Sequence, residues 1–412
     1  MVQLSYVLSS LALLSVATAA PSAEARHNHN GGPKAVYFMT NEAGGNNVVA
    51  LKVGRDGKLS DGSITSTRGK GASAINAANS APAGPDSTFS QDPLKVVGDM
   101  LAVVNPGSNT LSLFSIDSRD ATRLRLIGRP VDTMGDFPVS VAVSETLKTA
   151  CVANSGAKSG IACFSMSSRR GLRPLDKKLR SIPLNQSTPP SGPPSTISDT
   201  FFSSDSSYLF ATVKGDGANN TSNPGFLSVF PVKDGKVSRK ETRSSPPGTT
   251  TLFGSVPLPN SRRDDGSSGI FISDPGFGGL TVSVSKEHRR GDPSVSTLAT
   301  SRVDGQKASC WSTYSDKTGT AFLGDAGLNR LVEIDTASGA IVSETSPSNG
   351  NPGMLDLVAG GNYLYGLSAG APGGAAIAVF DVGGGKGKVR AIQNFRPKKF
   401  SGVSASGLTL KT

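Results

Sequence analysis

The hydrophobic pattern of this chain is built from pairs of short apolar runs separated by turn residues. Residues 101–116, LAVVNPGSNTLSLFSI, show it plainly: an apolar run, then Asn-Pro-Gly-Ser-Asn, then a run that alternates apolar and polar positions. Apolar and β-branched residues favour strands, whereas Asn, Pro and Gly favour the turn between them. The stretch therefore predicts a β-hairpin.

The same hairpin pattern recurs along the chain. Further copies begin at Lys34, Thr149, Tyr208, Gly269, Thr320 and Tyr363. With the first they make seven strand–loop–strand units, spaced mostly about 40 to 60 residues apart, which is typical of propeller blades. No segment shows a sustained helical period of apolar residues. We therefore predict an all-β fold, a seven-bladed β-propeller.

The two ends of the repeat region predict how the ring closes. Residues 402–411, GVSASGLTLK, resemble the first strand of the third unit, residues 138–148, but no strand pair follows them. The first unit, by contrast, begins directly with its second strand at Lys34. We expect the C-terminal strand to supply the missing inner strand of the first blade, because closure removes the exposed sheet edges of an open repeat.

The N-terminal segment differs from the rest. A short apolar run ending in Ala17-Thr18-Ala19 is typical of a secretory signal peptide. We expect a signal peptide at residues 1–19, a disordered leader at 20–33 and the propeller at 34–412. The protein is then secreted, extracellular or cell-wall associated, and the sequons at Asn185, Asn219 and Asn220 become candidate glycosylation sites.

The sequence leaves the bonding of two of the three cysteines open. Cys151 and Cys163 lie on the two arms of one predicted hairpin and are symmetric about Ala157. They form either a disulfide across adjacent strands or two small buried apolar residues. Cys310 is left over, and we expect it to be a buried thiol.

Composition and charge exclude several classes of partner. The formal charge of +11 is spread over many predicted loops, and its short basic clusters have no interleaved aromatic residues, so we expect no nucleic-acid partner. Scattered His and Cys residues do not form a metal set, and the Gly-rich stretches lack the spacing of phosphate loops. We expect a monomer without cofactor, metal or membrane span.

One face of the predicted propeller gathers the candidate ligand-binding residues. It carries the turns between second and third strands and the long connections between blades, and long loops in compact folds are often functional. The candidates on these turns are Asn41, Glu42, Asn105, Asn154, Asp216, Asp274 and Asp325.

Two stretches resemble a known family. Residues 36–60 (VYFMTNEAGGNNVVALKVGRDGKLS) and 104–117 (VNPGSNTLSLFSID) are similar to the lactonase family of seven-bladed propellers. That family includes bacterial 6-phosphogluconolactonase and the fungal carboxy-muconate lactonizing enzyme. The resemblance covers residues 34–411 and is closest to a secreted fungal branch described as carboxymuconate cyclase-like, some members of which are cell-surface glycoproteins.

The resemblance implies a catalytic His beside Glu and Arg, and this chain departs from that pattern. The matching region, residues 194–210, contains no His. His27 and His29 lie in the predicted leader, and we expect His288 on the opposite face. An active site would instead use Glu42 or Asp274 as acid and base, with Arg129 or Arg243 holding a carboxylate. The alternative is that these acids only stabilise their own turns.

Two functions follow from these observations. One is a secreted cell-wall or surface glycoprotein that acts by binding a small carboxylated molecule, a cell-wall polysaccharide or a host surface. The other is an extracellular lactonase or cycloisomerase acting on a small carboxylated or sugar-derived lactone. The lack of a His near the predicted site favours the first, and the fold-level resemblance favours the second.

Overall fold

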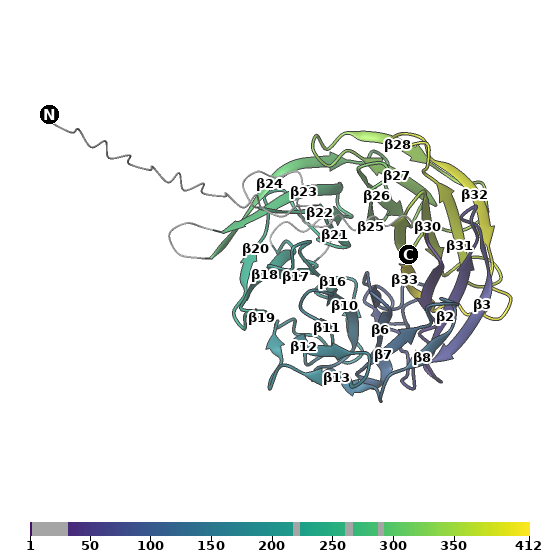
Figure 1. Ribbon diagram of the computed structural model, residues 1–412. Coiled ribbons are helices and arrows are strands. Elements are labelled where there is room, and N and C mark those ends of the chain that lie inside the picture. Colours follow the sequence, from purple (N-terminus) through teal and green to yellow (C-terminus); the bar gives the residue numbers. More distant parts are fainter. Residues whose placement is uncertain (2–31, 217–222, 260–266, 287–291) are drawn as a thin grey trace. The chain divides into compact units, whose positions relative to one another are not determined.

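The computed structural model describes residue 1 and residues 32–216, 223–259, 267–286 and 292–412. In these residues all but two short strands form seven antiparallel sheets of four or five strands, arranged around a common axis as the blades of a propeller (Figure 1). The prediction of a seven-bladed, all-β propeller is confirmed. The predicted signal peptide and nearly all of the leader lie outside the described residues, as do Asn219, Asn220 and His288.

The strands of each blade run in order from the axis outwards, and in the three five-stranded blades the last two strands both pair with the third. Blade 1 consists of β33 (Ser406–Lys411), β1 (Ala35–Met39), β2 (Asn47–Val53) and β3 (Leu59–Ser66). Blade 2 consists of β5 (Leu94–Val97), β6 (Met100–Asn105), β7 (Thr110–Ile116), β8 (Leu124–Leu126) and β9 (Val131–Asp132). Blade 3 consists of β10 (Pro138–Ser144), β11 (Thr149–Asn154), β12 (Gly160–Ser167), β13 (Gly171–Pro174) and β14 (Arg180–Ser181).

The remaining blades repeat the same order. Blade 4 consists of β16 (Ile197–Phe202), β17 (Tyr208–Val213), β18 (Phe226–Lys233), β19 (Lys236–Val237) and β20 (Thr242–Ser244). Blade 5 consists of β21 (Ser255–Pro257), β22 (Ser268–Asp274), β23 (Gly278–Lys286) and β24 (Pro293–Arg302). Blade 6 consists of β25 (Ser309–Ser315), β26 (Thr320–Asp325), β27 (Arg330–Ile334) and β28 (Ile341–Thr345). Blade 7 consists of β29 (Leu357–Gly360), β30 (Tyr363–Ser368), β31 (Ala376–Asp381) and β32 (Arg390–Phe395).

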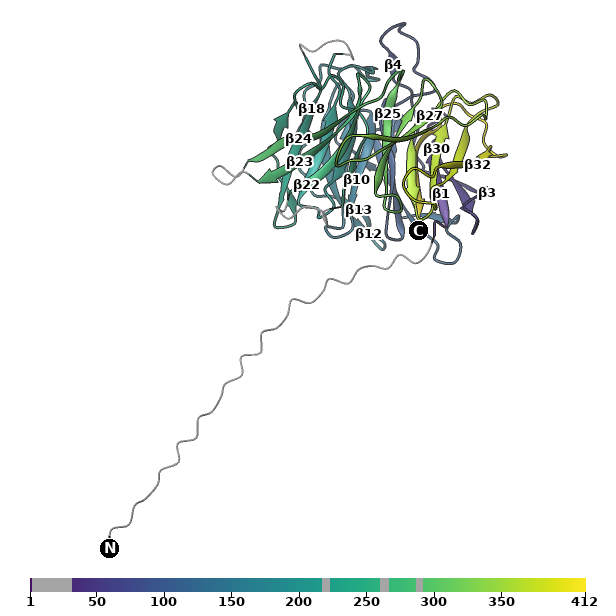
Figure 2. The ribbon, with the colours of Figure 1, turned by 90° about the horizontal axis from the view of Figure 1, so that it is seen from above.

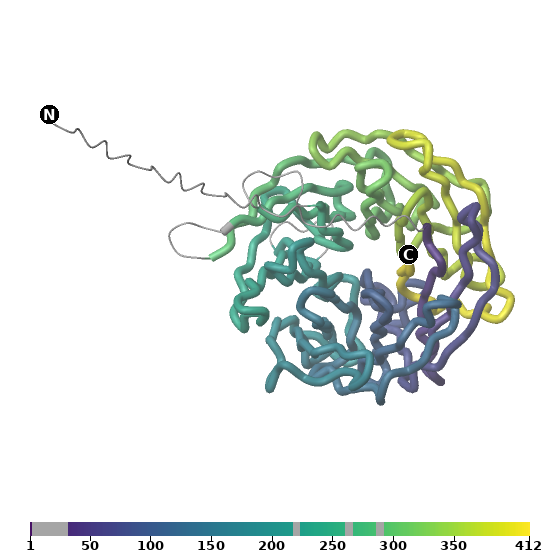
Figure 3. The backbone as a smooth tube through the Cα atoms, in the orientation of Figure 1, coloured from purple at the N-terminus to yellow at the C-terminus, as the bar shows by residue number. Residues whose placement is uncertain are grey.

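Blade 1 is completed by the C-terminal strand, as predicted. β33 pairs antiparallel with β1, with Ala35 opposite Lys411, and the Lys34 amide donates to the Lys411 carbonyl at 2.7 Å. In Figure 3 the yellow end of the chain lies beside its purple beginning. This pairing gives β1 a neighbour on both edges, and β33 takes the innermost position in blade 1 that β5 and β10 take in blades 2 and 3.

The core lies between neighbouring blades. β-branched and aromatic residues of the two middle strands are buried on both faces, because each sheet packs against a blade on either side. Phe114, Phe164, Phe210 and Phe380 are fully buried in this way. Burying each such side chain contributes roughly 1.5–3 kcal/mol. Among the described residues, no helix is long and apolar enough to cross a membrane.

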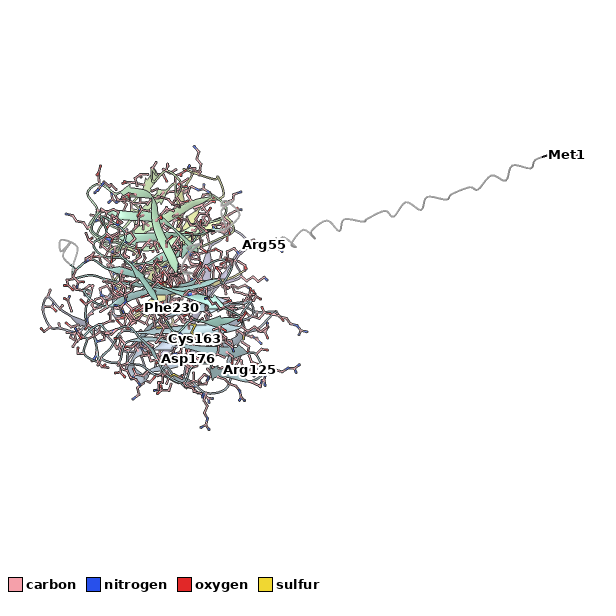
Figure 4. The ribbon with its side chains drawn as sticks, turned by 90° about the vertical axis from the view of Figure 1, so that its left-hand side faces the viewer. Met1, Arg55, Arg125, Cys163, Asp176 and Phe230 are labelled. Carbon is pink, nitrogen blue, oxygen red and sulfur yellow. A yellow bond between two sulfur atoms is a disulfide. The ribbon has the colours of Figure 1, made fainter. Side chains whose placement is uncertain are left out.

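Cys151 and Cys163 are joined by a disulfide in the structure. They face each other in register on β11 and β12, and both are buried. The Cys163 amide also donates to the Asp176 carboxylate at 2.7 Å, and Figure 4 labels both residues. Of the two alternatives that the sequence leaves open, the structure therefore has the bonded one. Cys310 is a free thiol.

The connection from blade 1 to blade 2 reaches the propeller axis. Part of it, β4 (Ile75–Asn76), pairs in parallel with β15 (Ser191–Gly192) at the edge of one face (Figure 2). We name the segment that follows, residues 86–92, the axial plug. Gln91 forms hydrogen bonds to the inner strands of blades 4, 5 and 6. Its backbone amide donates to the Ser198 carbonyl, its side-chain amide donates to the Ser255 carbonyl, and its side-chain oxygen accepts from the Ser312 amide. The plug therefore occupies the centre of the ring.

Candidate functional site

The ends of the second strands define what we call the turn face, the face that carries the turns between second and third strands. A polar residue stands at or within two residues of each of these strand ends. They are Asn41, Asn105, Asn154, Lys214, Asp274, Asp325 and Ser368. Five of these were predicted ligand-binding or catalytic residues, and the structure shows what each of them contacts.

Asp274 organises its own loop and is not free to act as an acid or base. Its carboxylate is fully buried and accepts from the Thr250 amide at 2.8 Å, the Thr251 amide at 3.2 Å and the Gly276 amide at 2.9 Å. The Thr250 hydroxyl donates to it as well, at 2.7 Å. These donors occupy both oxygens, so the expectation of a catalytic Asp274 does not fit the geometry.

Asp325 does the same in blade 6. It is fully buried and accepts from the amides of Lys307 at 3.0 Å and Ala308 at 2.9 Å, and it forms an ion pair with Arg330 at 3.1 Å. A buried carboxylate with this many donors is stabilised as an anion and holds the connection into its blade. Asp325 is therefore a structural residue, not a ligand contact.

The three asparagines also form hydrogen bonds within the protein, although the side-chain oxygen of Asn154 has no partner. Asn41 donates to the Ala72 carbonyl and the Ser87 hydroxyl, both at 2.8 Å, and accepts from the Ala72 amide. The Asn105 amide group bonds Thr110 and Ser112, and that of Asn154 donates to the Thr133 and Gly160 carbonyls. All three side chains are buried, so the structure gives them loop-stabilising roles.

Glu42 and Asp216 are exposed on turns. The Glu42 carbonyl closes its turn by accepting from Gly45 at 3.1 Å and Gly71 at 2.9 Å. Asp216 accepts from the Ser195 hydroxyl at 2.9 Å, and the Asn223 and Ser195 side chains hold the pKa of Asp216 below its usual range. Neither residue lines the cavity described below.

The predicted carboxylate clamps lie at the outside of the ring. Arg129 is exposed between the outer strands β8 and β9, and Arg243 is on β20, the outer strand of blade 4. Arg243 pairs with Glu241 at 2.6 Å and stacks on the Phe226 ring at 4.4 Å. The structure therefore does not bring these arginines to the axis. Asn185, the one sequon asparagine in the described chain, is exposed in a loop.

A cavity of about 440 Å³ opens on the turn face beside the axial plug. It is lined by segments of blades 4 to 7 together with Asp86 of the plug. The polar and aromatic lining residues are Asp86, Lys214, Thr251, Phe253, Cys310 and Trp311. Its size is that of a small-molecule site, which is commonly about 300–1,000 Å³ with apolar walls and few polar groups. We take this cavity as the candidate functional site.

Lys214 places a buried ammonium group in this cavity. Its side chain is almost fully buried, and Nζ donates to the Phe89 carbonyl at 2.6 Å and to the Thr196 hydroxyl at 3.1 Å. Nζ also lies 4.4 Å from the centre of the Phe253 ring. In its charged form the group has three hydrogens, so these two acceptors leave one N–H, which faces either the Phe253 ring or a ligand.

Asp86 supplies a carboxylate to the same cavity. One of its oxygens accepts from the Phe89 amide at 3.0 Å. Phe89 thus holds both charged groups, with its amide bonded to Asp86 and its carbonyl bonded to Lys214. Its backbone has a φ of 52°, a left-handed conformation that non-glycine residues rarely adopt and that is enriched at functional sites.

Burial shifts the pKa values of both groups toward neutrality. It lowers the pKa of Lys214 to about 7, and the charge of Asp86 opposes part of that shift. It raises the pKa of Asp86 to about 7, opposed by Lys214 and by the Phe89 amide. Burial also raises the pKa of the Cys310 thiol, so this cysteine is not an activated nucleophile. An acid and a base that titrate near pH 7 suit proton transfer.

The aromatic wall of the cavity is fixed by the plug. Phe253 and Trp311 meet edge to face with ring centres 4.9 Å apart. The Trp311 indole N–H donates to the Ser90 carbonyl at 3.1 Å. Because that donor is already satisfied, the rings offer a ligand an apolar surface rather than further hydrogen bonds.

A second set of charges lies deeper along the axis. Asp199 and Asp356 are fully buried, and Asp92 pairs with Lys95. Burial, and then the nearby charge of Asp92, raise the pKa of Asp199 and of Asp356 well above the usual range. Asp199 accepts from the Ser140 hydroxyl and the Ser255 amide, which link three inner strands. Within the described residues no group of His, Cys, Asp and Glu is arranged to hold a metal ion.

The two charged residues of the cavity, Lys214 and Asp86, were not among those predicted. Aligning the strand ends provides a signal for Lys214, because the other blades place Asn, Asp or Ser where blade 4 has a cation. No comparable alignment of the sequence identifies Asp86. It lies in a Pro- and Ser-rich loop, and only the fold brings that loop to blade 4.

Comparison with known proteins supports the fold. No family model matches the sequence, and no curated protein matches it. The periplasmic gluconolactonase PpgL of Pseudomonas aeruginosa superposes with a TM-score of 0.60 at 16% identity, over 92% of this chain and 99% of that chain. A candidate 6-phosphogluconolactonase from Bacteroides fragilis gives a TM-score of 0.57 at 13% identity, over 92% and 98%. At these identities the likeness establishes the propeller fold alone.

Proposed function

We propose that this chain is a propeller lactonase that hydrolyses a small, unphosphorylated lactone in the cavity beside the axial plug. The observation that carries the proposal is that the buried Lys214 and the half-buried Asp86, both bonded to Phe89, line one cavity against an apolar wall. Burial, which brings the pKa of each group to about 7, supports it. Similarity in fold to gluconolactonases supports it as an analogy.

The residues divide the reaction between them. Water attacks the lactone carbonyl carbon while the Asp86 carboxylate accepts a proton from that water. The free N–H of Lys214 donates to the carbonyl oxygen as negative charge develops on it. When the ring C–O bond breaks, the proton on Asp86 passes to the ring oxygen. The product is a hydroxy acid, and Asp86 and Lys214 return to their starting states.

The charge of the cavity limits the substrate. Lys214 is the one cation among its lining residues and Asp86 the one carboxylate. A phosphate group is bound best by several cationic groups, and this lining contains one. The cavity therefore favours neutral lactones over phosphorylated ones.

Turnover assays on glucono-δ-lactone and on 6-phosphogluconolactone test the proposal. We expect turnover of the neutral lactone, little of the phosphorylated one, and loss of activity in Lys214→Met and Asp86→Asn. Glu42→Gln is the control, because Glu42 is exposed away from the cavity. Activity that survives Lys214→Met but not Glu42→Gln would contradict the proposed site.

Binding without turnover is the second candidate function. Lys214 is already held by Phe89 and Thr196, which suits a fixed recognition group as well as a proton donor. The protein would then act as a secreted surface glycoprotein. Saturable binding of a lactone or hydroxy acid, abolished by Lys214→Met and unaccompanied by turnover, would favour this function over the first.

We also propose that the chain is secreted and glycosylated. The buried disulfide between Cys151 and Cys163 supports export, because structural disulfides persist in oxidising compartments. The exposed sequon at Asn185 supports glycan attachment. Mass spectrometry of protein from the culture medium tests both, with Ala20 expected as the first residue and a glycan on Asn185. Recovery of uncleaved, unmodified protein from the cytosol would contradict them.

A further inference from the structure

A second, larger cavity lies on the face opposite the turn face. It has a volume of about 1060 Å³ and is formed at the edge of blades 1, 2 and 7. It exceeds the usual range of about 300–1,000 Å³ for sites that enclose one small molecule. Its lining includes the start of the propeller at residues 32–34, the β2–β3 turn and the β7–β8 turn.

Positive charge dominates this groove. Its lining contains five cationic side chains and two carboxylates; the cations are Lys34, Lys52, Arg55, Arg119 and Arg123. All five are exposed, and Figure 4 labels Arg55 at the margin of the molecule. We call this surface the basic groove.

The two carboxylates do not neutralise the groove. Asp120 pairs with Arg123 at 3.2 Å and accepts from the amide and hydroxyl of Thr122. Asp61 accepts from the Lys398 amide at 3.1 Å. Within the described chain, no carboxylate is in ion-pair contact with the other four cations: Lys34, Lys52, Arg55 and Arg119.

We propose that the basic groove binds a segment of an acidic polysaccharide, such as a polyuronate. The free cations match carboxylate groups repeated along a sugar chain, and Ser118 adds a small hydroxyl side chain to the lining. The groove lining lacks the features of other polyanion sites. Its one aromatic residue, Tyr363, bonds the Arg55 carbonyl and packs against Gly57, and no large apolar side chain is exposed in the lining.

The position of the basic groove leaves the cavity at Lys214 accessible while a polysaccharide is bound. It lies on the opposite face from Lys214, so both sites can be occupied at once. Protein held through the basic groove on an acidic cell-wall polymer would keep its turn face open to small molecules. This inference does not depend on lactone chemistry in the other cavity.

The test is a binding titration of the full secreted protein with polygalacturonate. Lys52→Glu/Arg119→Glu reverses two free groove cations. Arg169→Glu/Arg170→Glu makes the same charge change in the β12–β13 turn, outside the groove, where both arginines are exposed. We expect the groove variant to lose roughly tenfold or more in affinity, with a weakened salt dependence, and the control variant to lose less than about twofold.

The outcomes separate the alternatives. Equal losses in both variants would show attraction by net charge alone and overturn the proposal. Tighter binding to a single-stranded oligonucleotide or to anionic phosphatidylserine vesicles than to polygalacturonate would also overturn it. Melting temperature verifies that each variant folds. Lactone turnover is expected to be unchanged in the groove variant, so failure of polysaccharide binding is distinct from failure of the proposed hydrolase.

Discussion

The second strands of blades 4 and 5 end at the same place in the repeat, where Lys214 directly follows one strand and Asp274 ends the other. Asp274 is surrounded by amide and hydroxyl donors of its own loop, which satisfy both of its oxygens. Lys214 has two acceptors for three hydrogens and faces a cavity. The comparison teaches that burial and charge at a strand end do not mark a site. What distinguishes Lys214 is an incomplete set of protein partners together with a cavity in front of it.

The largest expected difference between the two residues is in turnover. Lys214→Met should lower kcat/KM for a neutral lactone by roughly 10²–10⁴-fold, because it removes the cation at the carbonyl oxygen. Asp274→Asn keeps the shape of the side chain and lies outside the chemistry, so folded Asp274→Asn protein should retain activity within about twofold. Steady-state kinetics on both variants checks this. Equal losses would mean that Lys214 acts only through the fold.

For the free energy of unfolding the order should be reversed, with the larger effect at Asp274 and the smaller at Lys214. Asp274→Ala leaves several buried donors without an acceptor and should lower the free energy of unfolding by about 3 kcal/mol. Lys214→Met removes the cost of burying an ammonium group but leaves the Phe89 carbonyl without its donor, so the two effects oppose each other and the free energy of unfolding should change less than in Asp274→Ala. Urea denaturation of both variants measures the difference. A large destabilisation by Lys214→Met would assign Lys214 a structural role like that of Asp274.

The effect of Lys214→Met on stability should depend on pH. In the folded protein the pKa of Lys214 is lowered to about 7, so between pH 7 and its ordinary value the unfolded chain binds the proton more strongly. Wild-type stability contributed by this group therefore rises with pH across that window. The change in melting temperature caused by Lys214→Met should therefore be more favourable at pH 6 than at pH 9. A change in melting temperature that is the same at both pH values would contradict the lowered pKa.

Glu42→Gln should have the smallest effect. Glu42 is exposed on the turn face of blade 1, and its turn is closed by its carbonyl group rather than by its carboxylate. Turnover should change by less than about twofold and the free energy of unfolding by less than about 0.5 kcal/mol. The same kinetic and urea measurements apply. Loss of activity in this variant would show that Glu42 takes part in the reaction.

The fold could be predicted from the sequence because its determinants are local or repeated. Paired apolar runs specify each hairpin, and their recurrence specifies the blades. The closure of the ring could also be predicted, because residues 402–411 resemble the first strand of a blade but no hairpin follows them. The turn residues Asp274 and Asp325 were located correctly on one face, but their roles depend on which backbone amides surround them. Sequence pattern does not record those contacts.

The candidate site could not be predicted because it is assembled from distant segments. Asp86 comes from the connection after blade 1, Lys214 from blade 4 and Trp311 from blade 6. They meet because the axial plug enters the ring and bonds several inner strands at once. A loop rich in Ala, Ser and Pro has no periodicity from which that path follows. The shifted pKa values of Asp86 and Lys214 arise from burial that only this assembly creates.

A crystal structure with a non-hydrolysable analogue of a neutral sugar lactone tests the central claim most directly. The account predicts the analogue in the cavity beside the axial plug, against Phe253 and Trp311, with its carbonyl oxygen accepting from Lys214 Nζ. An analogue bound elsewhere on the turn face, with Lys214 bonded only to Phe89 and Thr196, would contradict it.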